Sequence, residues 1–367
     1  MNIVNIKDTS GKLFYIGGVV RDEILGRESF DIDITYEGNA IEYCAKFGEV
    51  IRVNPDFGTI RVNVGGREVD FASTRAEVYD RKGHLPRITQ IGCSLKEDVL
   101  RRDFTINALA KSVTTGEITD YTGGLDDLKN KTLRVLHDES FIDDPTRIIR
   151  GLKFAVRFGF KPDEHTKKLQ EDYLSHINYD MCYKRVKKEL IETFNLNSQT
   201  AFEMFINQGI YKLVTEKEVK LPDINIEDLI KKYPVKNIWL VYAGILRDLS
   251  RIELTRQEKK ILDDFSALEN SRMNNDFEIY KAFENCETET ILLYAILKDA
   301  TKARRYLDDL RKIKIQITGE DLLQLGIKPS PEYKKLFDAV LYARLQNPKM
   351  TKDDEINLLK NHQRINK

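Results

Sequence analysis

Phe-Asp-Ile-Asp-Ile-Thr, at residues 30–35, is the stretch that decides the fold, because apolar and acidic residues alternate along it. Such an alternation is typical of a half-buried β-strand. Successive side chains of a strand point to opposite faces, so Asp31 and Asp33 should share one face, away from the isoleucines. Two carboxylates held side by side repel each other unless a cation lies between them, and Mg2+ takes carboxylate and phosphate oxygens as ligands. On this pattern alone, a solvent-facing edge strand is an equally good interpretation.

A glycine pair precedes this strand. Tyr-Ile-Gly-Gly-Val-Val-Arg-Asp, at residues 15–22, predicts an apolar strand that turns into a helix through Gly17 and Gly18. Backbone N–H groups in such a turn can approach a phosphate closely. Together with Asp31 and Asp33, the turn leads to the hypothesis of a metal-dependent phosphoryl or nucleotidyl transfer site.

The composition is that of an ordinary protein with a sizeable core: 367 residues, of which 41% are hydrophobic and 32% charged. This length allows two or three domains. Lys+Arg and Asp+Glu are both 59, so the formal net charge is zero and any basic surface for a nucleic acid must be local. The clearest local excess lies in residues 147–188, which a solvated helical face would also explain.

Cysteine usage and hydropathy favour a cytoplasmic protein. The four cysteines are scattered without a Cys-x-x-Cys pair, which suits reduced thiols. The apolar runs are too short to span a bilayer, and residues 1–15 contain no apolar core of a signal peptide. We therefore expect no membrane partner.

Strand and helix patterns alternate up to about residue 137, and helical patterns dominate from there on. Gly65-Gly66 separates two strand-like runs at 60–64 and 67–72, which predicts a hairpin. On the second run Asp70 is either a third carboxylate beside Asp31 and Asp33 or a residue that faces water. The polar residues 73–90 predict a loop near the site.

Two basic clusters follow. Arg101-Arg102-Asp103 combines guanidinium forks, which suit phosphates and carboxylates, with a carboxylate that can accept hydrogen bonds from hydroxyls such as those of a ribose. Asp144-Pro145-Thr146-Arg147 predicts a helix start, after which Arg150 and Lys153 continue a row of donors at spacings of three. Both clusters also fit solvated charge. The apolar positions between the donors already supply a core, so we expect the row to face something else.

In this order the motifs resemble motifs A to D of the class II tRNA nucleotidyltransferases, a family of CCA-adding, CC-adding and A-adding enzymes and bacterial poly(A) polymerases. The motifs that carry the resemblance are Gly-Gly-Val-Val-Arg-Asp (17–22), Asp-Ile-Asp-Ile (31–34), Arg-Arg-Asp-Phe-Thr-Ile-Asn-Ala (101–108), a segment with Gly-Gly and Asp-Leu (120–128), and Asp-Asp-Pro-Thr-Arg-Ile-Ile-Arg (143–150).

The resemblance implies an α+β protein with a β-polymerase-like nucleotidyltransferase head that contains a mixed sheet, followed by an all-α neck, body and tail. The expected bounds are 1–137 for the catalytic head, 138–200 for the neck that recognises the base, 201–300 for the body and 301–367 for the tail that binds tRNA.

Carried over by position, the resemblance implies that Asp31 and Asp33 hold two Mg2+ ions, with Asp70 a candidate third catalytic carboxylate. Asp144 and Arg147 would read the base, because a carboxylate beside a guanidinium matches the amino and ring-nitrogen edge of cytosine and adenine. The nucleotide-binding set that we expect is Gly17, Gly18, Arg21, Arg101, Arg102, Asp103, Asn107, Asp144, Arg147, Arg150 and Lys153.

The expected function is addition of CCA to tRNA 3′ ends from CTP and ATP, with release of pyrophosphate. The alternatives are an A-adding enzyme that acts on tRNA ending in CC, a poly(A) polymerase, and a tRNA-binding module without activity. Residues 75–86, and the form Asp-Asp-Pro-Thr-Arg that motif D takes at residues 143–147, are more similar to the A-adding lineage than to ordinary CCA-adding enzymes. Lys153 and Lys184 also depart from the Arg and Glu that are usual at these positions.

Overall fold

The computed structural model describes residue 4, residues 6–29 and residues 31–365, so Phe30 of the deciding stretch lies outside the described residues. The chain divides into two compact units, Met1–Glu218 with Ser250–Glu253 and Val219–Leu249 with Leu254–Lys367, and each is described by itself. Within the described ranges, no helix has the length and apolar character needed to cross a membrane. The finer division into head, neck, body and tail stays a prediction.

The first unit is built on a mixed sheet. β2 and β5 pair in parallel, and the other neighbouring strands of the sheet pair antiparallel. Among the described residues seven strands join it, in the order β3 (Glu49–Asn54), β4 (Thr59–Val64), β5 (Arg67–Ser73), β2 (Asp33–Tyr36), β1 (Leu13–Ile16), β8 (Ala110–Ser112) and β9 (Ile118–Thr119).

The deciding stretch forms the middle of this sheet. The predicted strand is confirmed, although it begins at Asp33, so that Asp31 lies just before β2. Ile34 is fully buried and Asp33 is solvent-accessible, as the alternation predicted. The predicted hairpin between β4 and β5 is also confirmed, with Gly65 and Gly66 at its turn.

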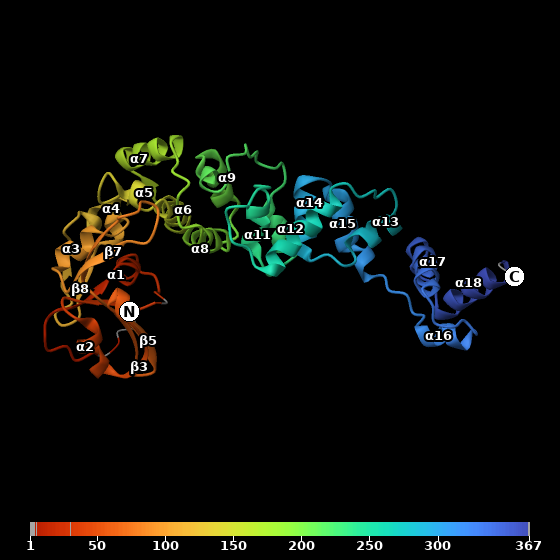
Figure 1. Ribbon diagram of the computed structural model, residues 1–367, viewed down its shortest axis with the longest axis horizontal. Helices are drawn as coiled ribbons and strands as arrows, with labels where there is room; N and C mark the ends of the chain where they lie inside the picture. The colour runs from red at the N-terminus through yellow and green to blue at the C-terminus, as the bar shows by residue number, and fades with distance from the viewer. Residues whose placement is uncertain (1–3, 5, 30, 366–367) are drawn as a thin grey trace. The chain divides into compact units, whose positions relative to one another are not determined.

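Helices cover the sheet and extend the first unit (Figure 1). Leu95 and Val99 pack with Ile16 and Ala110 in one apolar cluster, which fixes the helix that carries them against the sheet. A short parallel pair, β10 (Thr132–Leu133) and β11 (Lys161–Pro162), lies outside the main sheet. The helices of this unit are α1 (Gly18–Ile24), α2 (Ala40–Cys44), α3 (Leu95–Leu100), α4 (Gly124–Asn130), α5 (Ser140–Asp143), α6 (Thr146–Phe158), α7 (Glu164–Ser175), α8 (Tyr183–Phe194) and α9 (Gln199–Asn207).

The expectation of a loop at residues 73–90 is wrong. β6 (Arg75–Val78) and β7 (Arg87–Ile91) form an antiparallel hairpin. Charged and apolar residues alternate only over the four residues of β6, and β7 is apolar only at Ile88 and Ile91, so periodicity gave a weak signal. The tip is fixed by a close approach: Gly83 has φ +79°, and a Cβ there would lie 2.9 Å from the carbonyl oxygen of Asp180.

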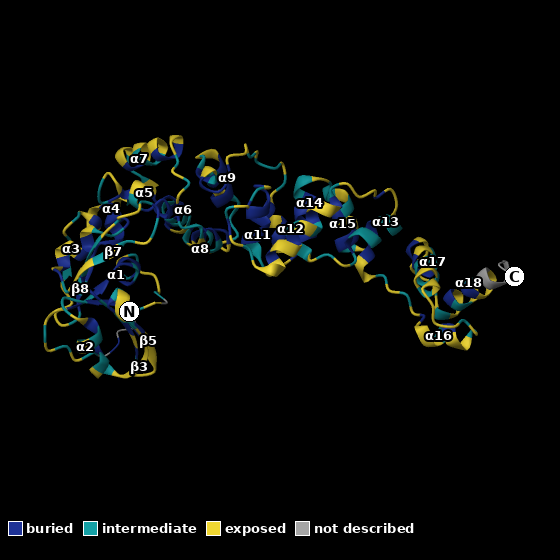
Figure 2. Cartoon of the chain, viewed as in Figure 1, coloured by how far each residue is buried: buried dark blue, intermediate teal, exposed yellow. Residues whose placement is uncertain are grey.

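Among its described residues, the regular elements of the second unit are all helices, joined by loops. Helix α11 is buried along most of its length, whereas α17 has a long exposed face (Figure 2). Glu355 is fully buried and accepts hydrogen bonds from the backbone N–H groups of Gln316 and Ile317 and from Arg344. The helices are α10 (Ile226–Lys232), α11 (Ile238–Gly244), α12 (Arg256–Leu268), α13 (Asp276–Phe283), α14 (Thr288–Leu297), α15 (Ala300–Asp308), α16 (Gly319–Gln324), α17 (Glu332–Gln346) and α18 (Lys352–Ile365).

Candidate active site

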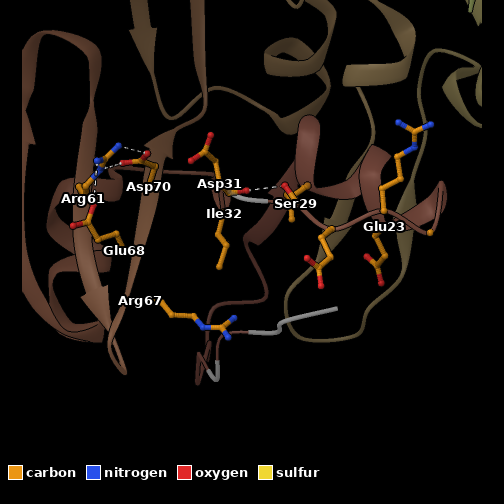
Figure 3. Close-up of a pocket in the computed structure, with 12 residues that line it drawn as sticks. Glu23, Ser29, Asp31, Ile32, Arg61, Arg67, Glu68 and Asp70 are labelled. Carbon is orange, nitrogen blue, oxygen red and sulfur yellow. Dashed lines mark hydrogen bonds and ion pairs between the residues drawn. The ribbon is translucent and has the colours of Figure 1, made fainter. Parts of the chain in front are cut away.

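Three carboxylates meet where β2 and β5 run side by side. Asp33 on β2 is the direct register partner of Asp70 on β5. Asp31 and Asp70 both line one cleft, and Figure 3 shows Ile32 directed away from the carboxylate of Asp31. The parallel register, which pairs residues far apart in sequence, therefore brings the predicted carboxylates together.

The charges around Asp33 act on its protonation. Although Asp33 opens on a cleft, its partial removal from bulk water raises the pKa of its carboxyl group. Arg102 opposes this rise in pKa, whereas the negative charges of Asp70 and Asp31 add to it. A group whose charged form is disfavoured by its neighbours gains from a cation. Oxygen-only donors of this kind suit a hard divalent ion whose other ligands come from phosphates and water.

Asp70 has a partner within the sheet. Arg61 on β4 donates from Nε and Nη2 to the two oxygens of Asp70, at 2.6 and 2.7 Å. In the part of the chain that the structure describes, no group of three His, Cys, Asp or Glu side chains is arranged to hold a metal ion. The metal contacts expected of Asp31 and Asp33, like that of Asp70, therefore stay predictions.

Two clefts open beside these carboxylates. The cleft drawn in Figure 3 has a volume of about 720 Å³ and is lined by Asp31 and Asp70. The other has a volume of about 540 Å³ and is lined by Asp33 and Asp70, with Arg102 among its basic residues. Arg61 lines both. A substrate with several phosphate groups thus finds positive charge on both sides of the carboxylates.

Arg102 lies against the glycine turn. Gly17 has φ +70°, and a Cβ there would lie 3.3 Å from Nη1 of Arg102. The fully buried Asp98 holds the guanidinium of Arg102 in place. Its Oδ2 accepts a hydrogen bond from Nη2 of Arg102 at 2.9 Å. Nε of Arg102 is buried and has no hydrogen-bond partner among the described residues. Asp98 also accepts two hydrogen bonds from Arg101, at 2.7 and 3.0 Å.

A buried chain of hydrogen bonds leads from this turn to α6. Arg21 on α1 donates to Oδ1 of Asn107 at 2.6 Å, and Asn107 donates to Oδ1 of Asp103 at 2.9 Å. Arg150 on α6 donates to Oδ2 of Asp103 at 2.8 Å. Burial alone would raise the pKa of Asp103, but Arg150, the hydrogen bond from Asn107 and the charge of Arg147 hold it well below its ordinary value.

The cationic row on α6 has acidic partners on α8. Glu189 is buried and accepts from Arg150 at 3.1 Å and from Lys153 at 2.9 Å. Lys153 also donates to the more exposed Glu192. The row therefore faces another helix and the end of the buried chain, instead of solvent.

The two candidate base readers occupy the start of α6. Asp144 accepts from Oγ1 of Thr146 at 2.6 Å and from Arg185 on α8. Arg147, only 4% exposed, donates to Oγ of Ser140 at 2.7 Å and to the carbonyl oxygen of Arg101 at 2.9 Å. Nε of Arg147 lies 3.9 Å from Oδ2 of Asp144. Donor and acceptor are thus neighbours in a fixed frame.

Sequence reasoning missed Arg61 and Asp98. Arg61 alternates with the buried Ile60 and Val62, so the pattern that placed Asp70 also indicated the face of Arg61. Asp98 lies in the first turn of a capped helix, where an acid is expected for its effect on the helix end. Arg101 and Arg102 follow it at spacings of three and four, so helical periodicity could have indicated both pairs.

A protein family, two relatives and a solved structure are similar to this chain, and together they cover most of its length. Residues 13–134 match the poly A polymerase head domain family. An A-adding tRNA nucleotidyltransferase of Aquifex aeolicus is 32% identical over 86% of this chain and 43% of the relative, so the chain spans less than half of that protein. A CCA-adding enzyme of Lactobacillus helveticus is 26% identical, covering 93% of this chain and 92% of the relative. The structure of a Thermotoga maritima CCA-adding enzyme complexed with tRNA_CCA has a TM-score of 0.74 and 25% identity, covering 96% of this chain and 91% of that one.

The buried Asp103–Arg150 pair predicts a specific pH dependence of stability. Because the pKa of Asp103 is lowered in the folded protein, its contribution is complete above the unfolded value of about 3.9 and is lost as the pH falls through the folded value. In urea unfolding, Asp103→Asn should lower the free energy of unfolding by on the order of 3 kcal/mol at pH 7. The difference between the two proteins should shrink below about pH 4.

Glu192→Gln provides the control for this experiment, since its side chain is 40% exposed and its pairing should contribute less than about 1 kcal/mol. A difference between Asp103→Asn and the unaltered protein that stays constant from pH 7 to pH 3 would contradict the assignment.

Proposed function

This chain carries a poly A polymerase head domain and is a homologue of the CCA-adding and A-adding tRNA nucleotidyltransferases, and from that premise we propose that it extends the 3′ ends of tRNA. The resemblance identified from the motifs is confirmed, as is the α+β fold class. The proposed reaction is addition of CCA from CTP and ATP with release of pyrophosphate. tRNA and nucleoside triphosphates are the proposed partners, and Mg2+ the proposed metal.

One observation carries this proposal: the parallel register of β2 and β5 sets Asp33 beside Asp70, with Asp31 just before β2 and Arg102 near the turn at Gly17. Carboxylates next to a guanidinium and a glycine turn supply what a triphosphate with a divalent cation requires. A merely structural role does not account for so many like charges beside two neighbouring strands in the middle of a sheet.

Asp31 and Asp33 would hold the metal, and the two-ion arrangement implied by the motif resemblance is part of the proposal. When bound, Mg2+ would neutralise phosphate oxygens and favour loss of the proton from the RNA 3′-hydroxyl. Arg102, held by Asp98, would bind the triphosphate beside Gly17, where the missing Cβ leaves room for its guanidinium.

The transfer forms one bond and breaks another. The 3′-oxygen of the RNA bonds to the α-phosphorus of the nucleotide, the bond from that phosphorus to pyrophosphate breaks, and the hydroxyl proton passes to the neighbouring carboxylates. The contribution of the chain is mainly positional and electrostatic, because its donors are fixed before the substrate arrives. The buried link from Arg21 through Asn107 and Asp103 to Arg150 ties the head to the base-reading helix α6.

Asp144 and Arg147 would replace a nucleic-acid template. An acceptor and a donor on one helix end match the amino group and ring nitrogen of cytosine or adenine, whereas the carbonyl groups of uracil and guanine would face the carboxylate. Arg185 and Ser140, which bind this pair, would hold it in place.

The hairpin tip favours addition of A alone as a second candidate. Arg81 pairs with Asp180, and Arg185 contacts both the carbonyl oxygen of His84 and the carboxylate of Asp144. Because these contacts hold the hairpin in place, Asp144 would stay in one position. A residue that recognises the base from one fixed position favours one nucleotide. The relative from Aquifex aeolicus is an A-adding enzyme.

Paired incorporation assays test the proposal. Pure protein should incorporate CTP into tRNA that lacks CCA, and ATP into tRNA that ends in CC. Incorporation of ATP alone, limited to one residue on tRNA ending in CC, would replace CCA addition by A addition. Long A tails on unrelated RNA would indicate a poly(A) polymerase, and no incorporation would refute nucleotidyl transfer.

Asp33→Ala should lower incorporation by roughly 10³-fold or more, because a metal-holding group contributes several kcal/mol to the transition state. Binding of tRNA, measured by filter retention, should change by no more than about twofold, since Asp33 contacts the metal and not the phosphate chain. Asp126→Ala, which removes an exposed acid on α4, is the control. Activity that survives in Asp33→Ala would disprove the metal assignment.

Arg147→Ala should lower the selectivity for C and A over U on the order of tenfold, the effect of one charged hydrogen bond, as measured by competition between nucleotides. Arg157→Ala, on the same helix with a side chain that is 39% exposed, should leave this selectivity unchanged. Thermal unfolding of both variants checks that they are folded. If Arg147→Ala keeps the selectivity of the unaltered protein, Arg147 has only a structural role.

A further inference from the structure

The cleft beside Asp33 has a second wall that none of the nucleotidyltransferase motifs includes. It is formed by the neighbouring strands β3 and β4, and we call it the β3–β4 wall. Arg101 and Arg102 line the same cleft from the segment at the end of α3. The residues of the β3–β4 wall are Arg52, Asn54, Thr59, Ile60 and Arg61.

Strand register arranges four charged residues of this cleft in one row. Arg52 on β3 is the partner of Arg61 on β4, Arg61 is the partner of Asp70 on β5, and Asp70 is the partner of Asp33 on β2. All four line the same cleft. The row therefore begins with two positive charges and ends at the candidate catalytic carboxylates.

Arg52 is the residue of this row that the fold does not explain. Arg61 binds Asp70 and Glu68, and Arg102, which also lines the cleft, binds the buried Asp98. The side chain of Arg52 is exposed and makes no hydrogen bond or ion pair with any residue that the structure describes. Like charges directly opposite each other on neighbouring strands destabilise a sheet. Because Asp70 and Glu68 already pair with Arg61, the charge in this row that lacks a counter-charge among the described residues is that of Arg52, and a bound anion would supply one.

The position of Arg52 indicates which anion it binds. Three strand spacings, roughly 14 Å at about 4.8 Å each, separate the backbones of Arg52 and Asp33. The glycine turn at Gly17 and its neighbour Arg102 lie on the other side of Asp33, where β1 adjoins β2. A phosphate at Arg52 is thus on the far side of the carboxylates from the proposed triphosphate, as expected for the strand that attacks.

We propose that the β3–β4 wall binds the backbone phosphates of the last nucleotides of the single-stranded RNA 3′ end, with Arg52 as a positioning residue; this inference rests on the proposed function. The wall holds the 3′-hydroxyl toward Asp33 and Asp70 while the triphosphate lies at the glycine turn. Contacts to phosphates fix the register of the strand without reading its bases, which suits a site that must accept an end that grows.

Kinetic constants for each substrate test whether the β3–β4 wall binds the RNA 3′ end. Arg52→Ala and Arg52→Glu should raise KM for tRNA ending in CC, the latter by about tenfold, because a charged contact is lost and then reversed. KM for ATP should stay within about twofold, since phosphate contacts to the RNA act on that substrate alone. Arg52→Lys should restore the KM for tRNA. With one phosphate contact fewer, Arg52→Ala should reduce the slope of log K against log salt for binding to single-stranded RNA by about 0.7.

Lys129→Ala removes an exposed charge on α4, away from both clefts, and is the matched control. Unchanged KM for tRNA and an unchanged salt slope in Arg52→Glu would overturn the inference while the proposed function stands. A raised KM for ATP instead would assign the wall to the triphosphate and also overturn it. If the unaltered protein incorporates nothing, the proposed function fails. Fluorescence anisotropy with a labelled single-stranded RNA ending in CC then still tests whether the β3–β4 wall binds RNA. Equal affinity of the unaltered protein and Arg52→Glu would then refute an RNA-binding wall.

Discussion

The parallel pairing of β2 with β5 places Asp33 and Asp70 side by side, two like charges on neighbouring strands. Such an arrangement is unfavourable unless positive charge compensates it. Arg61, on the next strand, compensates the charge of Asp70 by hydrogen bonds. Arg102, in the segment after α3, lowers the pKa of Asp33 through its positive charge. The divalent ion proposed for this site would add to this compensation.

The supporting residues of the site are themselves buried ion pairs. Asp98 holds Arg102, and Glu189 holds Arg150, with each carboxylate almost wholly removed from solvent. Removal of one member of such a pair leaves an uncompensated charge, which is why these contacts keep the arginines in one arrangement. The arginines of the candidate site are therefore held in place by buried carboxylates of the chain itself.

Along the row from Arg52 to Asp33, the charge of the cleft changes from positive to negative. One end carries uncompensated positive charge, and the other carries the carboxylates next to the glycine turn at Gly17. This polarity separates the site proposed for the incoming nucleotide from the site proposed for the RNA end. The site proposed for base reading, at Asp144 before α6, is not part of this row.

Local pattern alone determined the strand at Asp33, the hairpin through Gly65 and Gly66, the glycine turn and the helical character of the later chain. These features follow from periodicity and turn chemistry, which act over a few residues. Motif order added the family, and with it the candidate ligands and base readers. Most partners of those residues, and the hairpin at 73–90, were decided only by tertiary structure, whereas the pair of Arg102 with Asp98 is local. Asp103 and Arg150 are 47 residues apart, and Asp33 meets Asp70 only through a parallel register. Periodicity reports the face on which a charge lies, whereas packing of distant segments decides which opposite charge it meets.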